Sequence, residues 1–128
     1  MGVFNSIFGK KTPKEEKILP WISLTNLEQL DEISENSKTK TQLIFKHSTR
    51  CGISRMVLNQ FVERYDLTDD DLDLYYLDLL NNRDVSNEVG YRFQVIHQSP
   101  QLLVIKNGHT VMHASHGAIN DLNLRDLI

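Results

Sequence analysis

The chain holds a single cysteine, Cys51, in surroundings typical of a reactive thiol. It follows the apolar run 41–47 and directly precedes a stretch of helical character that begins at Gly52. A thiol at a strand-to-helix turn faces the positive end of the helix dipole and unpaired backbone N–H groups, and both stabilise a thiolate. Because the thiolate is the reactive form of cysteine, this position favours thiol–disulfide exchange.

The neighbours of Cys51 point to exchange by one thiol only. Arg50 and Arg55 flank it and His47 lies just upstream, so the site is electropositive rather than the apolar setting of an inert buried cysteine. Ser54 stands three residues on, where a Cys-x-x-Cys enzyme has its second cysteine. A serine forms no disulfide, but its hydroxyl can donate a hydrogen bond to the sulfur of Cys51. We therefore expect a mixed disulfide on Cys51 that a second thiol molecule resolves.

Composition narrows the class of protein. A chain of 128 residues with 40% hydrophobic and 24% charged residues fits one globular domain, which we expect over residues 19–128 after a tail of residues 1–18. The net charge of -3 gives no support for a nucleic-acid partner. A lone cysteine excludes an internal disulfide and favours a reducing, cytoplasmic setting. No apolar stretch approaches the roughly 20 residues of a membrane span.

The N-terminal tail carries a pattern of its own. Met1-Gly2 with Ser6 matches the N-myristoylation pattern, and Phe4, Ile7 and Phe8 before two lysines could form a short interfacial helix. Since termini are usually poorly ordered, we expect a flexible or loosely packed tail.

The hydrophobic patterns predict alternating strands and helices. Strands are expected at 20–24, 41–47, 72–79, 101–106 and 109–113, with Asn107-Gly108 as the turn of a final hairpin. Helices are expected from a capping box of Thr25 and Glu28 to about Asn36, over 52–65, 83–93 and 120–128. The second helix is expected to bury Ile53, Met56, Val57, Leu58 and Phe61. Strand 41–47 has apolar groups on both faces, which predicts a central strand.

This order predicts an α/β protein of the thioredoxin-like fold. Helical crossovers make the central strands parallel, the final hairpin is antiparallel, and helices cover both faces of the mixed sheet. Ser99-Pro100 directly before a strand is a candidate cis-proline, which would leave the Ser99 backbone free to pair with an extended thiol ligand. His116 or Gly117, in the loop before the last helix, is expected to line the same groove.

The remaining aromatic and metal-ligating side chains favour structural roles. His109, His113 and His116 could join Cys51 in a metal site, but without acidic partners they are expected to be surface residues. The acidic run 69–71 is expected to be a solvated loop. Trp21, Tyr75 and Tyr76 are expected to pack in the core.

The segment Phe45-Lys-His-Ser-Thr-Arg-Cys-Gly-Ile-Ser54 resembles the monothiol bacilliredoxins of the YtxJ type, whose signature is a Lys-His-Ser stretch followed by Thr-Cys-Pro-Ile-Ser. The resemblance spans about residues 20–120 and includes Pro20-Trp-Ile, Tyr76-Leu-Asp78, Arg92-Phe, His97-Gln-Ser-Pro-Gln101 and Lys106-Asn-Gly108. It implies a thioredoxin-fold enzyme that removes bacillithiol from S-bacillithiolated proteins, with bacillithiol as co-substrate and no other cofactor. Cys51 would be the nucleophile, assisted by Arg50 and Ser54. Substrate contacts are expected from His47, Gly52, Arg55, Ser99, Pro100 and His116, with Lys46 as a further cation for the ligand's carboxylates.

Two departures from the family pattern keep alternatives open. Arg50 replaces a Thr and Gly52 replaces a Pro, so the motif Cys-Gly-Ile-Ser is one residue from the Cys-Gly-Phe-Ser of monothiol glutaredoxins. That motif belongs to carriers of iron–sulfur clusters, which would here need a dimer and two small thiols. The paired glycines of those proteins are absent after Pro100. A non-catalytic thioredoxin-like interaction domain is the third hypothesis.

Overall fold

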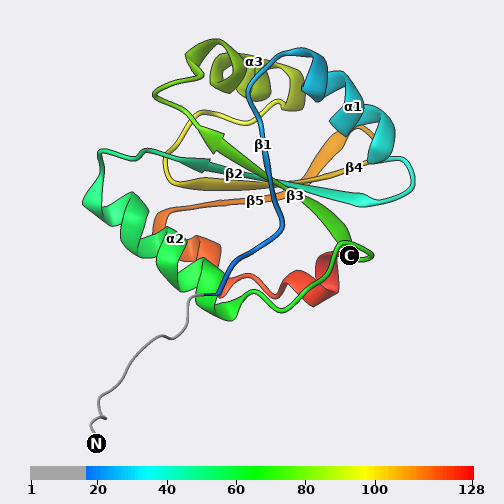
Figure 1. Cartoon of the computed structure of the whole chain (residues 1–128). Helices are drawn as coiled ribbons and strands as arrows, with labels where there is room; N and C mark the ends of the chain where they lie inside the picture. Colours follow the sequence, from blue (N-terminus) through cyan, green and yellow to red (C-terminus); the bar gives the residue numbers. More distant parts are fainter. Residues whose placement is uncertain (1–16) are drawn as a thin grey trace, which may run out of the picture.

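The computed structural model describes residues 17–128 as one mixed sheet with helices on both faces (Figure 1). The expected tail and its myristoylation pattern fall almost entirely outside these residues. None of the helices within 17–128 is both long and apolar enough to cross a bilayer. The elements in chain order are β1 (Trp21–Ser23), α1 (Glu28–Asn36), β2 (Thr41–His47), α2 (Gly52–Arg64), β3 (Leu72–Asp78), α3 (Arg83–Phe93), β4 (Gln101–Lys106), β5 (His109–Ser115), and the 3₁₀ turns η1 (His116–Asp121) and η2 (Leu124–Leu127).

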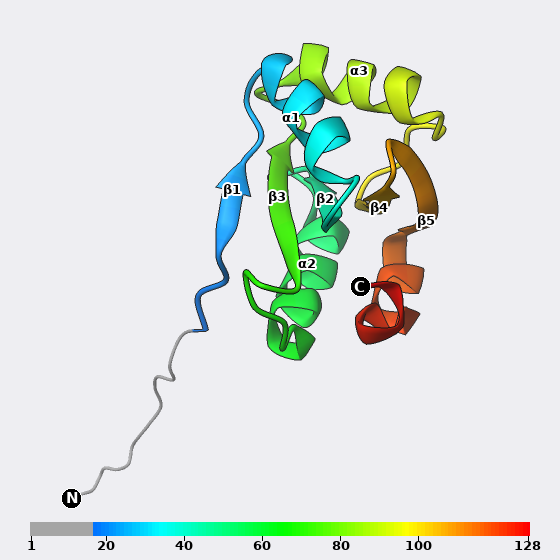
Figure 2. The same ribbon diagram turned by 90° about the vertical axis from the view of Figure 1, so that its right-hand side faces the viewer.

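The strands lie in the order β1-β3-β2-β4-β5, which Figure 2 shows from one edge of the sheet to the other. β2 pairs in parallel with β3, with His47 opposite Asp78, and antiparallel with β4, with Lys46 opposite Gln101. The predicted central position of this strand and the predicted parallel core are therefore confirmed. The Asn107-Gly108 turn is also confirmed, since both residues have positive φ, of 52° and 77°, as a tight hairpin requires.

The two faces of β2 pack against different helices. Leu43 and Phe45 contact the α2 residues Val57 and Phe61 in one core cluster, which Trp21 joins through its rings. Ile44 belongs to the cluster on the other face, with α1 and α3. Side chains alternate along a strand, so Lys46 lies on the α3 side and His47 on the α2 side. Figure 1 shows α1 and α3 together on one side of the sheet and α2 on the other.

The cap of α1 lies one residue later than predicted. Asn26 Oδ1 accepts the N–H of Gln29 at 3.0 Å, and Gln29 Oε1 accepts the N–H groups of Thr25 and Asn26 at 2.7 and 3.2 Å. These are the reciprocal bonds of a capping box, made by Asn and Gln rather than by Thr25 and Glu28. Both pairs have the required spacing, and burial of Leu30 and Ile33 fixes the register that selects the second pair.

The buried face of α2 was also predicted incorrectly in part. Val57 and Phe61 are buried as expected, but the third member of the stripe is Ser54, whereas Ile53 and Met56 are 60% and 53% exposed. The spacing 54, 57, 61 is a helical face. The apolar pattern did not identify the first position of this face, because the polar side chain of Ser54 occupies it.

The predicted closing helix over 120–128 is wrong. The chain instead forms the two 3₁₀ turns, separated by Leu122 and Asn123 in extended conformation, with ψ of 139° and 98°. Ile119 is buried against the α2 side of the sheet, and Leu122, Leu124 and Leu127 pack beside it at spacings that no single α-helix face supplies.

Candidate active site

Cys51 is the N-cap residue of α2 and is partly exposed. Its backbone is extended, with φ of -108° and ψ of 121°, and its carbonyl accepts the N–H of Arg55 at 3.0 Å. The N–H of Cys51 donates to Ser48 O at 3.2 Å, which closes a tight turn between β2 and α2. The sulfur therefore stands at the helix end where N–H groups lack intrahelical partners, the setting that stabilises a thiolate.

The two arginines beside Cys51 differ in how they are held. Arg55 donates from its guanidinium to Thr49 O at 3.0 Å and so fastens the thiol loop to the helix. Arg50 is exposed, and within residues 17–128 its side chain has no ion pair or hydrogen bond. Gly52 has no left-handed φ, and a Cβ there would meet nothing within 4 Å, so this side of the thiol is open.

His47 and Ser54 lie beneath the loop rather than on its surface. Ser54 is 0% exposed and His47 is 4% exposed. His47 Nδ1 lies 2.8 Å from Ser54 Oγ, which also accepts the N–H of Ser48 at 3.2 Å. In the described part of the chain, Ser54 makes no hydrogen bond to Cys51, in contrast to the expected contact. The expected substrate contact from His47 also differs from its position, because the imidazole is covered by the loop.

The Ser99–Pro100 peptide bond is cis and lies beside the thiol loop. Lys46 pairs with Gln101, so the start of β4 is next to the end of β2, where the loop of Cys51 begins. His116 donates its N–H to Pro100 O at 2.9 Å and is exposed, so the expected proximity of this loop to the proline is present. Ser99 Oγ is buried without a hydrogen-bond partner among the described residues.

Lys46 is the unexpected residue of this region. It is 0% exposed, on the sheet face opposite α2, so it does not reach a ligand at Cys51. Its ammonium contacts His97 Nδ1 at 2.8 Å and donates to Gln101 Oε1 at 3.3 Å. Within residues 17–128 no carboxylate pairs with it. The burial of Lys46 could have been predicted from the sequence, because a strand with apolar groups on both faces also buries a lysine near its end.

Burial lowers the pKa of Lys46 to about 8. It also lowers the pKa of His97, with smaller contributions in the same direction from Lys46 and Arg83. Burial disfavours the charged form of each base, and two neighbouring bases disfavour each other's charge. The two side chains together with Gln101 join β2 to β4 and the loop before Pro100.

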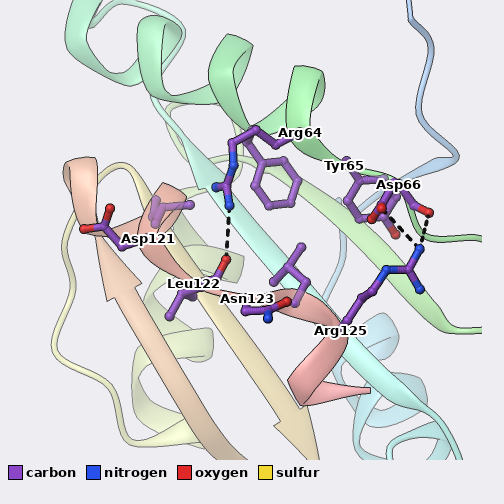
Figure 3. A pocket seen from close by; sticks show the side chains of 10 residues that line it. Arg64, Tyr65, Asp66, Asp121, Leu122, Asn123 and Arg125 are labelled. Carbon is purple, nitrogen blue, oxygen red and sulfur yellow. Dashed lines mark hydrogen bonds and ion pairs between the residues drawn. The ribbon is translucent and has the colours of Figure 1, made fainter.

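A cavity of about 380 Å³ lies at the other end of α2 (Figure 3). Arg64, Tyr65 and Asp66 line it from α2 and the segment that follows, and Leu122 and Arg125 line it from the C-terminal segment. Arg64 donates to Leu122 O at 3.4 Å and Arg125 pairs with Asp66 at 3.1 Å. A helix of 13 residues is about 20 Å long, so this cavity is separate from the thiol.

The histidines do not converge on the cysteine. In residues 17–128 there is no group of three His, Cys, Asp or Glu side chains placed to hold a metal ion. His109 and His113 are exposed on the edge strand β5, as expected of surface residues.

Several solved structures of thioredoxin-fold proteins are similar to this chain. A structure described as a candidate oxidoreductase with a thioredoxin fold is 33% identical, covers 84% of this chain and 92% of its own, and superposes with a TM-score of 0.69. A redox protein from Chlamydomonas reinhardtii is 20% identical, covers 84% of this chain and 35% of its own, and has a TM-score of 0.68. The thioredoxin of Schistosoma mansoni is 22% identical over 84% of this chain and 92% of its own, with a TM-score of 0.61.

These similarities confirm the thioredoxin-like fold. A match to a family model identifies the family within that fold. The model of the monothiol bacilliredoxin BrxC matches residues 22–124, which contain both the thiol loop and the cis-proline. The chain therefore belongs to the monothiol bacilliredoxin BrxC family, whose members share a thioredoxin-like fold and thiol redox function.

Proposed function

We propose that this protein removes bacillithiol from S-bacillithiolated cytoplasmic proteins through a mixed disulfide on Cys51. The observation that carries the proposal is a single, partly exposed thiol at the N-cap of α2, with the buried Ser54 where a resolving cysteine would stand. Membership of the bacilliredoxin family supports the choice of thiol.

The reaction would take two exchange steps. The Cys51 thiolate attacks the bacillithiol sulfur of the protein–bacillithiol disulfide, the S–S bond breaks, and the protein cysteine leaves as a thiolate. A second bacillithiol thiolate then attacks the bacillithiol sulfur of the Cys51 adduct. Cys51 leaves as a thiolate and bacillithiol disulfide is released, so two electrons pass from bacillithiol to the substrate protein.

The side chains around Cys51 suit a small anionic thiol. Bacillithiol carries malate carboxylates, and the guanidinium of Arg50 beside the thiol, which has no partner among residues 17–128, is suitable for binding them. We assign the backbone of Ser99 at the cis-proline to holding the extended ligand, with His116 and Gly52 at the sides of the groove.

Intact mass measurement of the reduced protein mixed with a bacillithiolated model protein tests the proposal. We expect a gain of one bacillithiol on Cys51 and release of the model protein as a free thiol, and Cys51→Ser should abolish both. Full exchange by Cys51→Ser would refute the proposal. Reaction with a glutathionylated substrate alone would instead favour the glutaredoxin-like hypothesis, and no reaction with either substrate would favour an interaction domain.

A further inference from the structure

Two distant segments of the sequence meet at one buried side chain. Lys46 lies near the end of β2, and His97 and Gln101 bound the segment that contains Ser99. The ammonium of Lys46 lies 2.8 Å from His97 Nδ1 and donates to Gln101 Oε1 at 3.3 Å. These three side chains, the Lys46 cluster, therefore connect the strand before the thiol loop to both ends of the segment 97–101.

Lys46 is a costly side chain to bury. It is 0% exposed, and within residues 17–128 no carboxylate pairs with it, so only neutral acceptors compensate its charge. Burial lowers its pKa to about 8, and the ammonium is still the main form at pH 7. Replacing a poorly compensated buried charge by an apolar side chain often stabilises a protein. A charge that is kept at a cost in stability is expected to serve function instead.

The charge of Lys46 fixes the orientation of both its partners. An ammonium has donors only, so His97 Nδ1 must accept, and the proton of the neutral imidazole is then on Nε2. Burial lowers the pKa of His97, which keeps the imidazole neutral at pH 7. Gln101 Oε1 must accept as well, and this turns its amide nitrogen toward two further acceptors, Ile96 O at 3.0 Å and Ser115 Oγ at 3.4 Å.

The loop of residues 96–100 is thus held at its two ends and open in its middle. The hydrogen bonds of the Lys46 cluster hold its start. At its end, Pro100 O accepts the N–H of His116 at 2.9 Å. Between these points, no backbone–backbone hydrogen bond within residues 17–128 engages Ser99. The backbone of Ser99 is the part of the loop that would hold the thiol ligand in the proposed reaction.

We propose that Lys46 is a positioning residue for substrate binding, whose ammonium acts through His97 and Gln101 to hold the loop 96–100 in the conformation that presents the backbone of Ser99 to the thiol ligand. Lys46 itself does not reach the ligand, because it is buried on the sheet face away from α2. It acts on the binding of the substrate and not on the reactivity of the thiol. The inference rests on the proposed function only for the identity of that ligand.

Backbone ¹⁵N relaxation of the full reduced chain tests the positioning directly. For the amides of Gln98 and Ser99 we expect order parameters of about 0.85, typical of rigid backbone, in wild type and below about 0.6 in Lys46→Met. Methionine fills a similar volume but donates neither hydrogen bond. Lys106→Met, at the other end of β4, is the matched control and should keep the wild-type values. A loop as rigid in Lys46→Met as in wild type would overturn the proposal.

Steady-state kinetics separate positioning from an effect on the thiol. A loop that occupies its binding conformation for about a tenth of the time weakens the apparent affinity about tenfold. We therefore expect Lys46→Met to raise KM for a bacillithiolated substrate about tenfold and to change kcat less than about twofold. Alkylation of Cys51 by iodoacetamide, which needs no binding groove, should proceed at similar rates in Lys46→Met and wild type. An unchanged KM would refute the proposal, and so would equal losses in kcat and alkylation rate.

Gln101→Met tests whether Lys46 acts through the contacts of the loop. It removes the amide that joins Lys46 to Ile96 O and leaves the lysine in place. We expect it to raise KM as much as Lys46→Met does, and the double variant to be no worse than either, because the two side chains act as one unit. Additive losses would contradict the shared route. Thermal melts show whether each variant is folded, and if one is not, the other decides.

The outcomes separate this proposal from the proposed function. Turnover of a bacillithiolated substrate by wild type, with the same KM in Lys46→Met, would refute the positioning role and leave the proposed function intact. Relaxation uses no thiol substrate. A loop that loosens in Lys46→Met, together with no bacillithiol transfer by wild type, would refute the proposed function and support the positioning of the loop by Lys46.

Discussion

Arg50 is the charged side chain of the thiol loop that is least tied to the rest of the protein. Arg55 is held by Thr49 O, whereas Arg50 is exposed and unpaired among the described residues. A charge-assisted contact at an exposed site contributes about 1 kcal/mol, which is about fivefold in affinity. We expect Arg50→Ala to raise KM for a bacillithiolated substrate about fivefold and to leave kcat nearly unchanged.

The matched control for this variant is Arg125→Ala. It removes the same charge at the far end of α2, where Arg125 pairs with Asp66. Steady-state kinetics at low and high salt would separate a local contact from the overall charge, because exposed contacts are screened by salt. Equal effects of the two substitutions would argue against a ligand contact by Arg50.

Lys46 makes stability depend on pH in an unusual direction. Its pKa is about 8 in the folded protein, against an ordinary value of 10.5. Between these values the unfolded chain binds more protons than the folded one, so the free energy of unfolding rises as pH rises through this window. Below pH 8 the buried charge costs about 3 kcal/mol.

Replacing this lysine with an apolar side chain of similar length removes that cost. We expect Lys46→Met to be more stable than wild type at pH 7.5, and the advantage to disappear towards pH 10.5. The gain is reduced by whatever the hydrogen bonds of Lys46 to His97 and Gln101 contribute to the wild-type protein. Urea unfolding at several pH values measures the difference, with the exposed Lys38→Met as the control. A difference that stays constant with pH would contradict the assigned shift.

At the scale of elements, the residue that caps α1 in the structure differs from the one that the sequence pattern predicts. Asn26 makes the capping bond to Gln29, whereas the side chain of Thr25 makes none to the helix. Loss of an N-cap side chain costs about 1 kcal/mol. We therefore expect Asn26→Ala to lower the free energy of unfolding by about this amount and Thr25→Ala to leave it nearly unchanged. Urea denaturation of both variants measures these losses. A larger loss for Thr25→Ala than for Asn26→Ala would mean that the predicted capping box of Thr25 and Glu28 is the one that forms.

Elements with strong periodicity were predictable, and those that depend on distant packing were not. β2, α3 and the Asn107-Gly108 hairpin follow from apolar runs, helical spacing and turn residues that act locally. The face of α2 and the C-terminal turns depend on which side chains the sheet accepts, which single-sequence patterns do not encode. At the site, Cys51 was evident from its residue type and position. The burial of Lys46 could have been inferred from the apolar groups on both faces of its strand, whereas the burial of His47 and Ser54 required knowledge of which strand faces which helix.

At the scale of the whole molecule, the thiol loop is attached to a strand that is paired on both sides. β2 pairs with β3 on one side and β4 on the other, and Leu43, Ile44 and Phe45 in it are fully buried. β5 lies at an open edge of the sheet with mostly exposed side chains, and β1 at the other edge has three residues. Buried central strands open only with global unfolding, whereas edges open locally.

Amide hydrogen exchange rates should therefore differ between the central and the edge strands of the sheet. We expect the amides of Leu43 to Phe45 to exchange slowest, at rates set by the global free energy of unfolding, and those on the outer side of β5 to exchange faster by orders of magnitude. Native-state exchange followed by NMR measures both in one sample. Equal protection of β5 would mean that its edge is covered in solution. Slow exchange of these β2 amides would mean that the strand leading to His47 is rigid in the free protein. The thiol loop is then anchored on a rigid strand before any substrate binds.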